Sequence, residues 1–367
     1  MELNGIIKKM GGAFEKAAEL IGATLNSKEP ILMRYHGDCD GICAALSIYL
    51  SMKEMLGGDF EEQRKRMLIF KNQTAVYELR SVVDDLELMR NMGGKPLAVL
   101  LDFSMNEESA DSLKALRKAG FSVLVVDHHP VDEVGDVVLI SPWLYGGNSD
   151  YSAGLLAGKI AEKLKQFDGL EELERVSLAG DKSKLIKPSE EEERKALVLD
   201  YMASDSYFAE SLEMYYSNLR NPKAVDSIYQ KAMRRIERVK NDALRYAKVK
   251  ELGNGFKLVV VRLDKVKSGE FPPKGKICNE VLSEFGKEEV PVVVIGHDER
   301  AFHFRANGKA KEAGFNANYI IKELKGEMSE MIESGGGHDV AAGLRANEGF
   351  ERMVLEEIVK KIERISN

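Results

Sequence analysis

Hydrophobic and polar positions follow a repeating order along the first half of the chain. Short apolar runs, each long enough for one buried strand, occur at 30–35, 97–101 and 122–126. Around them lie longer segments with apolar side chains at helical spacing, at 3–24, 42–56, 77–92 and 107–118. Strands that alternate with helices form parallel βαβ units, which hold ligands at the carboxyl ends of the strands. We therefore expect a parallel α/β domain with its site at that edge.

The second half begins with a charged helical stretch. Ser189 to Glu192 has the spacing of a helix-capping box, and the helical pattern continues to about Lys250 with one break near Pro222. Its basic residues predict either a cationic face or an ordinary solvated helix, and they are Lys231, Arg234, Arg235, Arg238 and Lys240. A glycine-rich turn at 253–255 then leads into apolar runs that predict the strands of a smaller α/β domain, at 258–261, 290–295 and 301–305.

The length of the chain supports more than one domain, because 367 residues exceed what one core usually holds. The pattern divides them into an α/β domain, a helical connector and a smaller α/β domain, at 1–187, 188–250 and 251–367. With 44% apolar and 31% charged residues the composition is that of a packed soluble protein, and no apolar run reaches the roughly 18 residues of a membrane span. The first residues lack the order of a signal peptide, so we expect a cytoplasmic protein.

Net charge and cysteine content limit the kinds of site that the chain can have. Three cysteines without a CxxC pair support neither a disulfide framework nor a thiolate zinc site. A net charge of −7 means that any affinity for nucleic acid must come from a local basic patch or from bound metals. Glutamine is rare where Lys, Arg and Glu are abundant, a composition that favours a thermophilic source.

Asp and His residues follow all three predicted strands of the first domain. They are His36, Asp38 and Asp40, then Asp102, and then Asp127, His128 and His129. Such side chains gathered at one sheet edge would repel or mis-titrate one another without a cation between them, which predicts divalent metals. Alternation along 36–40 would put three ligands on one side, and Gly41 would let the next helix start close to the site. Taken singly, Asp38 or Asp40 could instead cap that helix, and His128 could be a core histidine.

These motifs, in this order, resemble those of the DHH phosphoesterase superfamily, whose name is the triplet at 127–129. The segment 36–41 is similar to the first motif of the superfamily, the strand end at Asp102 to the second, and Gly180-Asp181 to the fourth. Near the far end, 335–338 with the small residues that follow is similar to the glycine-rich signature of the DHHA1 domain. The resemblance covers nearly the whole chain and implies a two-domain DHH–DHHA1 fold.

The resemblance also implies two divalent metal ions, with Mn²⁺ favoured over Mg²⁺. One metal would be held by His36, Asp38 and Asp102. The other would be held by Asp40, Asp102, His128 and Asp181, so that Asp102 bridges the two. His129 would face the scissile phosphate, and Asp127 would orient a ligand histidine. Two such cations neutralise phosphate oxygens and activate a shared water for in-line attack. For Asp181 a solvated loop aspartate is the alternative.

In the second domain, the glycines Gly335, Gly336 and Gly337 would let backbone N–H groups approach a phosphate, and His338 would add a donor. A flexible glycine turn is the alternative, although the small residues at 341–343 follow at helical spacing. Arg305 resembles the arginine that family members direct at substrate phosphates. We interpret the two remaining histidines of this domain, His297 and His303, as structural.

The domain arrangement resembles that of RecJ-like exonucleases and of smaller oligonucleotide and cyclic-dinucleotide hydrolases. His36 stands where bacterial RecJ has an aspartate, so the chain is most similar to archaeal RecJ-like nucleases and their Hef-associated subgroup. We expect an exonuclease on single-stranded DNA or RNA that acts in DNA repair. A 3′-to-5′ polarity and a Hef-type helicase partner are implied only by that subgroup. The alternatives are a hydrolase of short oligonucleotides or cyclic dinucleotides, and an inactive replication scaffold. A homo-oligomer is compatible with the sequence.

Overall fold

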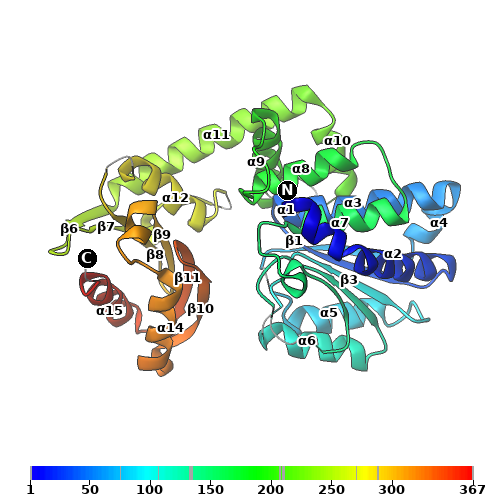
Figure 1. The fold of residues 1–367 in the computed structure, drawn as a ribbon, viewed down its shortest axis with the longest axis horizontal. Coiled ribbons are helices and arrows are strands. Elements are labelled where there is room, and N and C mark those ends of the chain that lie inside the picture. Colours follow the sequence, from blue (N-terminus) through cyan, green and yellow to red (C-terminus); the bar gives the residue numbers. More distant parts are fainter. Residues whose placement is uncertain are drawn as a thin grey trace. The chain divides into compact units, whose positions relative to one another are not determined.

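The computed structural model of the protein describes residues 2–365 except 75, 106, 132–134, 206–207, 209–210, 270 and 287–288. The chain divides into two compact units, Met1–Tyr229 and Gln230–Asn367 (Figure 1). Each unit has its own sheet and its own helices on both faces of that sheet. No helix among the described residues is both long enough and apolar enough to cross a membrane.

The first unit is built on a five-stranded sheet with the order β2-β1-β3-β4-β5. Every neighbouring pair is parallel, as the alternation of strands and helices predicts. The strands are β1 (Ile31–His36), β2 (Met67–Asn72), β3 (Leu97–Leu101), β4 (Ser122–Val126) and β5 (Val138–Ile140). The pattern predicts β1, β3 and β4, but we did not predict the two edge strands, because β2 is only partly buried and β5 is three residues long.

Helices cover both faces of this sheet, which explains why its central strand β3 is apolar and buried at every position. Met33 and Val99 pack into one core with α2, α3 and α7, whereas Leu32 and Leu100 pack into the other with α5 and α6 (Figure 1). The α-helices before residue 165 are α1 (Glu2–Lys9), α2 (Gly11–Asn26), α3 (Cys39–Leu56), α4 (Phe60–Arg64), α5 (Leu79–Met89), α6 (Glu107–Lys118) and α7 (Ala153–Leu164). The short 3-10 helices are η1 (Gly57–Asp59) and η2 (Pro142–Tyr145).

The predicted connector is not one continuous helix. It contains α9 (Glu190–Ser204), α10 (Leu212–Leu219) and α11 (Pro222–Arg245), and α8 (Leu170–Gly180) precedes it. The predicted capping box opens α9, since Ser189 accepts a hydrogen bond from the Glu192 amide and Glu192 accepts one from the Ser189 amide. The helical prediction is wrong for 247–250, which belong to a strand. Because the division between the two units falls inside α11, the three domain boundaries stay a prediction.

The second unit is built on a six-stranded sheet with the order β10-β11-β9-β8-β7-β6. The strands are β6 (Ala247–Glu251), β7 (Lys257–Arg262), β8 (Val292–His297), β9 (Ala301–Ala306), β10 (Ile332–His338) and β11 (Ala341–Ala346). Only β7 and β8 pair in parallel among these described strands. The helices are α12 (Lys274–Phe285), α13 (Gly308–Glu312), α14 (Ala317–Glu327) and α15 (Glu351–Glu363), with short 3-10 turns η3 (Leu263–Lys265) and η4 (Ser329–Met331).

The predicted glycine loop and the helical spacing after it are both wrong, because these residues form two paired antiparallel strands. Gly335 pairs with Leu344, and Gly337 pairs with Ala342. Gly337 has a φ of 140°, and a Cβ there would lie 2.6 Å from the Cα of Ala342. Glycine is therefore required by the close pairing of β10 with β11. Residues without side chains show no hydrophobic alternation, so the pattern of the sequence could not reveal the strand.

Candidate metal centre

The end of β1 and the start of α3 bring the first acidic residues into place. His36 ends β1, and the Asp38 carboxylate accepts a hydrogen bond of 3.0 Å from the Gly41 amide as the N-cap of α3. A Cβ at Gly41 would collide with the carbonyl of His36, so glycine allows the helix to begin directly at the strand end. The helix begins at Cys39, three residues earlier than predicted. Alternation along an extended turn therefore does not place Asp40 with the other two side chains.

Asp40 lies in the first turn of α3 and is fully enclosed. Its carboxylate accepts hydrogen bonds of 2.7 Å from the amides of Ala153 and Gly154, at the start of α7. It also accepts one of 2.6 Å from the hydroxyl of Ser177 on α8. One of its oxygens is 3.7 Å from Nε2 of His128. Asp40 thus ties three helices together at the edge of the cluster, and its predicted role as a metal ligand stays a prediction.

Asp102 lies between two histidines at the end of β3. One carboxylate oxygen is 3.2 Å from Nδ1 of His36, and the other is 3.4 Å from Nε2 of His128. Its amide donates to the carbonyl of Val126, which holds it beside the end of β4. Its φ of 61° is in the left-handed region, which aspartate tolerates better than most residues. A carboxylate that reaches both strand ends has the position that a bridging ligand needs.

The end of β4 contributes the triplet. Nδ1 of His128 lies 2.8 Å from the carbonyl oxygen of Ser149, and a proton shared there leaves Nε2 free to bind a metal. Nδ1 of His129 lies 2.8 Å from the buried carboxylate of Asp127. The resemblance implied that Asp127 orients a ligand histidine, but in the structure its hydrogen bond goes to His129, the residue expected to face the phosphate.

Asp181 completes the cluster from α8. It is the C-cap residue of that helix, and one of its oxygens is 3.4 Å from Nδ1 of His128. The turn after it is held to the loop at 149–152 by the Ser183 hydroxyl, which donates to the carbonyl of Asp150 at 2.6 Å. Asp181 is therefore not the solvated loop residue that was its alternative.

The charges of this cluster shift the pKa values of its members in different directions. Burial lowers the pKa of His36, but Asp38 and Asp102 outweigh it and the pKa rises to about 11. Burial raises the pKa of Asp102, but the neighbouring imidazole rings of His128 and His36 outweigh it and hold that pKa well below its usual range. Burial and the neighbouring Asp40 raise the pKa of Asp181 well above its usual range. The acidic groups thus receive too little positive charge from the histidines alone.

The cluster fits divalent cations on its own geometry. Oδ1 of Asp102, Oδ2 of Asp127 and Oδ2 of Asp181 are buried and accept no hydrogen bond among the described residues. Leaving buried carboxylate oxygens unsatisfied is costly, and a cation would remove that cost. Three sets of side chains have ligand atoms within 4.8 Å of one another, namely His36 with Asp38 and Asp102, Asp102 with His128 and His129, and Asp40 with His128 and Asp181. The structure therefore brings the predicted ligands together.

In the second unit, two of the predicted substrate-binding residues, Arg305 and His338, lie in one row across three strands. Register pairs His338 of β10 with Ala341 of β11, and Ala341 with Arg305 of β9. Burial lowers the pKa of Arg305, and no carboxylate among the described residues forms an ion pair with it. Two residues further along these strands, Gly336 pairs with Gly343, and Gly343 pairs with His303. Glycines therefore lie next to these basic side chains. Alternation puts His303 on the same face as Arg305.

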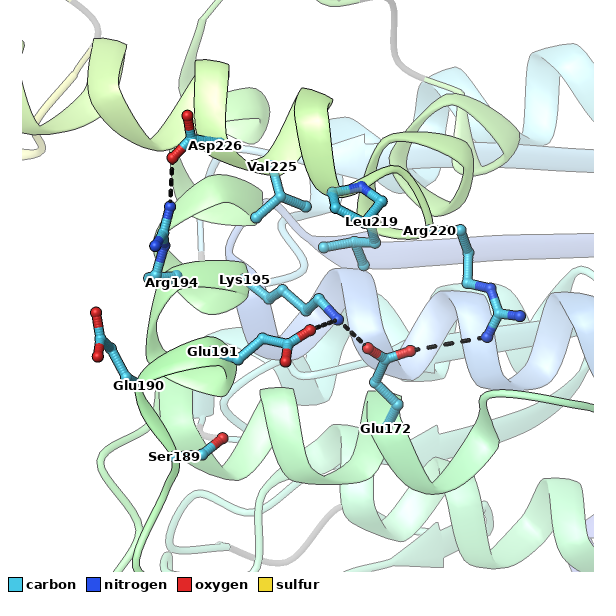
Figure 2. Close-up of a pocket in the computed structure, with 11 residues that line it drawn as sticks. Glu172, Ser189, Glu190, Glu191, Arg194, Lys195, Leu219, Arg220, Val225 and Asp226 are labelled. Carbon is cyan, nitrogen blue, oxygen red and sulfur yellow. Dashed lines mark hydrogen bonds and ion pairs between the residues drawn. The ribbon is translucent and has the colours of Figure 1, made fainter.

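A hollow of about 870 Å³ in the first unit is separate from the cluster (Figure 2). Its cations are already paired, because Lys195 contacts Glu172 and Glu191, and Arg194 lies 2.6 Å from Asp226. The lining residues are Glu172, Ser189, Glu190, Glu191, Arg194, Lys195, Leu219, Arg220, Pro222, Val225 and Asp226. None of them is a predicted ligand. We interpret this hollow as part of the packing between α8, α9 and α11 rather than as an anion site.

Sequence reasoning missed the loop at 141–152, which supports the cluster. The carbonyl of Ser149 contacts the ring of His128, and the indole of Trp143 donates to the carbonyl of the same histidine at 3.0 Å. Ser177 was missed as well, although it donates to Asp40. Backbone carbonyls and hydroxyl groups leave no charge pattern in a sequence. The one visible signal was a lone Trp next to Pro142 in a glycine-rich stretch.

Comparison with known proteins agrees with this architecture. Residues 30–178 match the DHH family, N-terminal domain, and residues 257–367 match the DHHA1 domain. An uncharacterised protein of Methanocaldococcus jannaschii is 24% identical over 97% of this chain and 54% of its own length. The chain thus spans about half the length of that relative.

Two solved structures are similar in fold. The DHH domain of a member of a family of ribosomal proteins has a TM-score of 0.87 at 23% identity, over 99% of this chain and 93% of that one. RecJ of Thermus thermophilus, solved in complex with Mn²⁺, has a TM-score of 0.64 at 13% identity, over 97% of this chain and 55% of that one.

A parallel sheet followed by a second sheet unit is the fold that this chain shares with these two solved structures, and in this chain the strand ends gather Asp and His. The chain therefore carries both a DHH domain and a DHHA1 domain.

Proposed function

We propose that the protein is a two-metal phosphodiesterase that degrades single-stranded DNA or RNA from an end. The observation that carries this proposal is the position of Asp102, whose two oxygens face histidines from two different strands while one of them accepts no hydrogen bond among the described residues. A second support is the row of Arg305 and His338 in the DHHA1 domain, where basic side chains stand beside glycines. Both features suit a phosphodiester chain.

Divalent cations held by this cluster would supply charge that neutralises phosphate oxygens and activates water. His36, Asp38 and Asp102 would hold one of them, and Asp40, Asp102, His128 and Asp181 would hold the other. The chain itself then has to orient these side chains and the substrate. Asp40 fixes the starts of α3 and α7, and the Ser149 carbonyl fixes the ring of His128. No protein nucleophile is required.

His129 is the side chain placed to handle a proton. Its Nδ1 is occupied by the hydrogen bond with Asp127, which fixes the ring and directs Nε2 to other partners. Burial lowers the pKa of His129, but this hydrogen bond outweighs it and the pKa is raised. Nε2 is therefore the nitrogen that donates to a phosphate oxygen or to the departing oxygen of the substrate.

Finer features of the proposal rest on the resemblance to archaeal RecJ-like nucleases. These are Mn²⁺ as the favoured metal, a 3′-to-5′ polarity, a role in DNA repair and a Hef-type helicase as partner. The complete set of ligand side chains favours catalysis over an inactive scaffold. A hydrolase of short oligonucleotides or cyclic dinucleotides is the second candidate, because the same centre would cut both kinds of substrate.

One experiment separates these candidates. Single-stranded 20-mers of DNA and RNA, labelled at either end, and a labelled dinucleotide are incubated with the protein and Mn²⁺ or Mg²⁺. The proposal predicts a ladder that shortens from one end of the 20-mers. If the dinucleotide is cut and the 20-mers stay intact, the protein is the hydrolase of short substrates. If no substrate is cut with either metal, the inactive scaffold is the interpretation that remains. The Asp102→Asn variant controls for contaminating nucleases.

A further inference from the structure

The only tryptophan in the chain lies beside the metal centre. Trp143 is in η2, its indole N–H donates to the carbonyl of His128 at 3.0 Å, and yet 41% of the residue is exposed. Its neighbour Leu144 is 59% exposed. A single exposed apolar residue needs no explanation. Here, however, two adjacent large ones lie on a turn that is hydrogen-bonded to a predicted metal ligand.

The ring of Trp143 is held in place from both sides of its turn. Pro142 begins η2 and is buried, and its carbonyl accepts a hydrogen bond of 2.9 Å from the amide of Gly147. Gly146 closes the turn in the left-handed conformation. The same loop continues to Ser149, whose carbonyl contacts the ring of His128. The loop therefore contacts His128 at two points, and these contacts fix the position of Trp143 relative to the metal centre.

The chemistry left to this side chain is that of a flat apolar surface. Its one hydrogen-bond donor is already used on His128, so it has no polar group with which to select a ligand. A π-face that is rigid and open to solvent recognises another planar ring by stacking, and nucleobases are the planar rings that accompany phosphodiesters. Inorganic polyphosphate has no ring with which to stack on it.

We infer that Trp143 is a stacking platform for a nucleobase of the bound substrate, next to the phosphodiester at the metal centre. This inference rests on the proposed function for the phosphate side of the substrate, and it adds a named contact to a base of that substrate. Stacking is tolerant of sequence, because every base has a π-face. The platform therefore fits an enzyme that cuts without base preference.

The lone tryptophan makes the test direct, because all indole fluorescence comes from this site. The chain with Asp102→Asn, which binds without cutting, is titrated with a single-stranded 20-mer, an abasic 20-mer of equal charge, and inorganic polyphosphate. We expect quenching by the base-bearing strand and little by the other two. Trp143→Ala has no indole, so its Kd is measured by the anisotropy of dye-labelled strands: for the base-bearing strand it should rise about 5- to 150-fold, the range for one stacked base, while the Kd for the abasic strand stays unchanged.

Two further variants separate stacking from support of His128. Trp143→Phe keeps a ring but loses the indole N–H, and we expect it to retain most of the affinity for the base-bearing strand. Leu144→Ala, at the neighbouring exposed position, should change the Kd for neither strand. Equal quenching by base-bearing and abasic strands would overturn the inference. It would also be overturned if Trp143→Phe lost affinity for the base-bearing strand and for the abasic strand alike. A ring covered by a second copy of the chain would also overturn it, shown by a dimer that Trp143→Ala dissociates and by no quenching with any strand.

The proposed function can fail independently of this inference. If the wild type cuts none of the strands with Mn²⁺ or Mg²⁺ but base-dependent quenching persists, the hydrolase assignment falls and the nucleobase platform stands. If the wild type cuts base-bearing and abasic strands with the same KM, and Trp143→Ala does likewise, the platform falls and the phosphodiesterase stands.

Discussion

Asp102 is the residue on which most of the cluster depends, and its backbone is in the left-handed region. Asparagine tolerates that conformation and keeps the size of the side chain, so Asp102→Asn removes the charge without adding strain. We expect hydrolysis to fall by at least about 100-fold, the upper end of the effect of changes outside the ligand shell. The fold should form, but the melting temperature of the metal-free protein should fall, because the charges of His36 and His128 lose a buried partner. EDTA should silence the wild type to the same extent.

Activity above about a tenth of wild type under saturating Mn²⁺ would show that Asp102 does not bridge two metals. Activity that persists in EDTA would show that hydrolysis does not depend on a metal ion. Circular dichroism of the variant controls for loss of the fold.

Glu174 on α8 gives a prediction about pH that is independent of the metal centre. Burial raises the pKa of Glu174 to about 7, although Lys159 lies 3.0 Å away and opposes the shift. A carboxyl whose pKa is raised on folding stabilises the native state fully below about 4.5, and this stabilisation is lost as the pH rises through 7. The shift corresponds to roughly 3 kcal/mol.

Glu174→Gln removes this titration while keeping the shape of the side chain. The difference in unfolding free energy between the variant and the wild type should therefore move in favour of the variant between about pH 4.5 and 8. Denaturant melts of both proteins across this range measure the change. A difference that is constant with pH would show that the pKa of Glu174 is not raised. Glu162→Gln, at a more exposed partner of Lys159, is the matched control.

At the scale of elements, the pairing of β10 with β11 depends on one glycine. A Cβ at Gly337 would lie 2.6 Å from the Cα of Ala342, whereas a Cβ at Gly336 would meet only Oδ1 of Asn318 at 4.0 Å. Gly337→Ala should therefore destabilise the second unit by about 1–3 kcal/mol, the usual cost of a strained backbone position. Gly336→Ala should stay within about 0.5 kcal/mol of wild type, as surface changes usually do. Equal losses for the two variants would contradict the observed register.

The sequence predicted the central elements of the fold because their pattern is strong. The bounds expected for β3, α6 and β4 coincide with those of the structure, since each is a buried strand or an amphipathic helix between clear breaks. The edge strands β2, β5 and β6 could not be predicted in this way, because an exposed edge needs little hydrophobic alternation. The glycines of β10 carry no pattern at all.

The candidate site was predictable where side chains carry the chemistry. Asp102 and His128 were predicted from their place after apolar runs, and the structure sets them 3.4 Å apart. The groups that hold the metal-ligand side chains in place were not predictable, because they belong to the backbone of a loop. Ser149 reaches His128 through its carbonyl, and no residue type is needed for that.

At the scale of the whole molecule, the length of the substrate should appear in the salt dependence of binding. On α11, Lys231, Arg234 and Arg238 are exposed and lie three and four residues apart, so they share one face. Two other predicted members of this cationic face are occupied, because Arg235 donates to the carbonyls of Ser268 and Phe271, and Lys240 pairs with Glu237. The face therefore consists of three basic residues.

Each phosphate contact on a single strand steepens the salt dependence by about 0.7 in the logarithmic slope. With the Asp102→Asn background, Arg234→Gln with Arg238→Gln should reduce the slope for a 20-mer by about 1.4 and leave a dinucleotide unaffected. Lys322→Gln with Lys325→Gln, which removes two exposed charges from α14, is the matched control. Equal and shallow slopes for the 20-mer and the dinucleotide would favour the hydrolase of small substrates.

The three hydrogen bonds that Asp40 accepts have a consequence for descent with modification. Because they join α3, α7 and α8, natural selection acts on this carboxylate for folding as well as for chemistry. Among the described residues, the carboxylate of Asp181 accepts no such bond from a helix terminus, whereas His36 still contacts Asp38, the N-cap of α3. In a lineage that abandoned hydrolysis, mutations at Asp181 should accumulate first, while Asp40 persists as a relic of the lost enzyme.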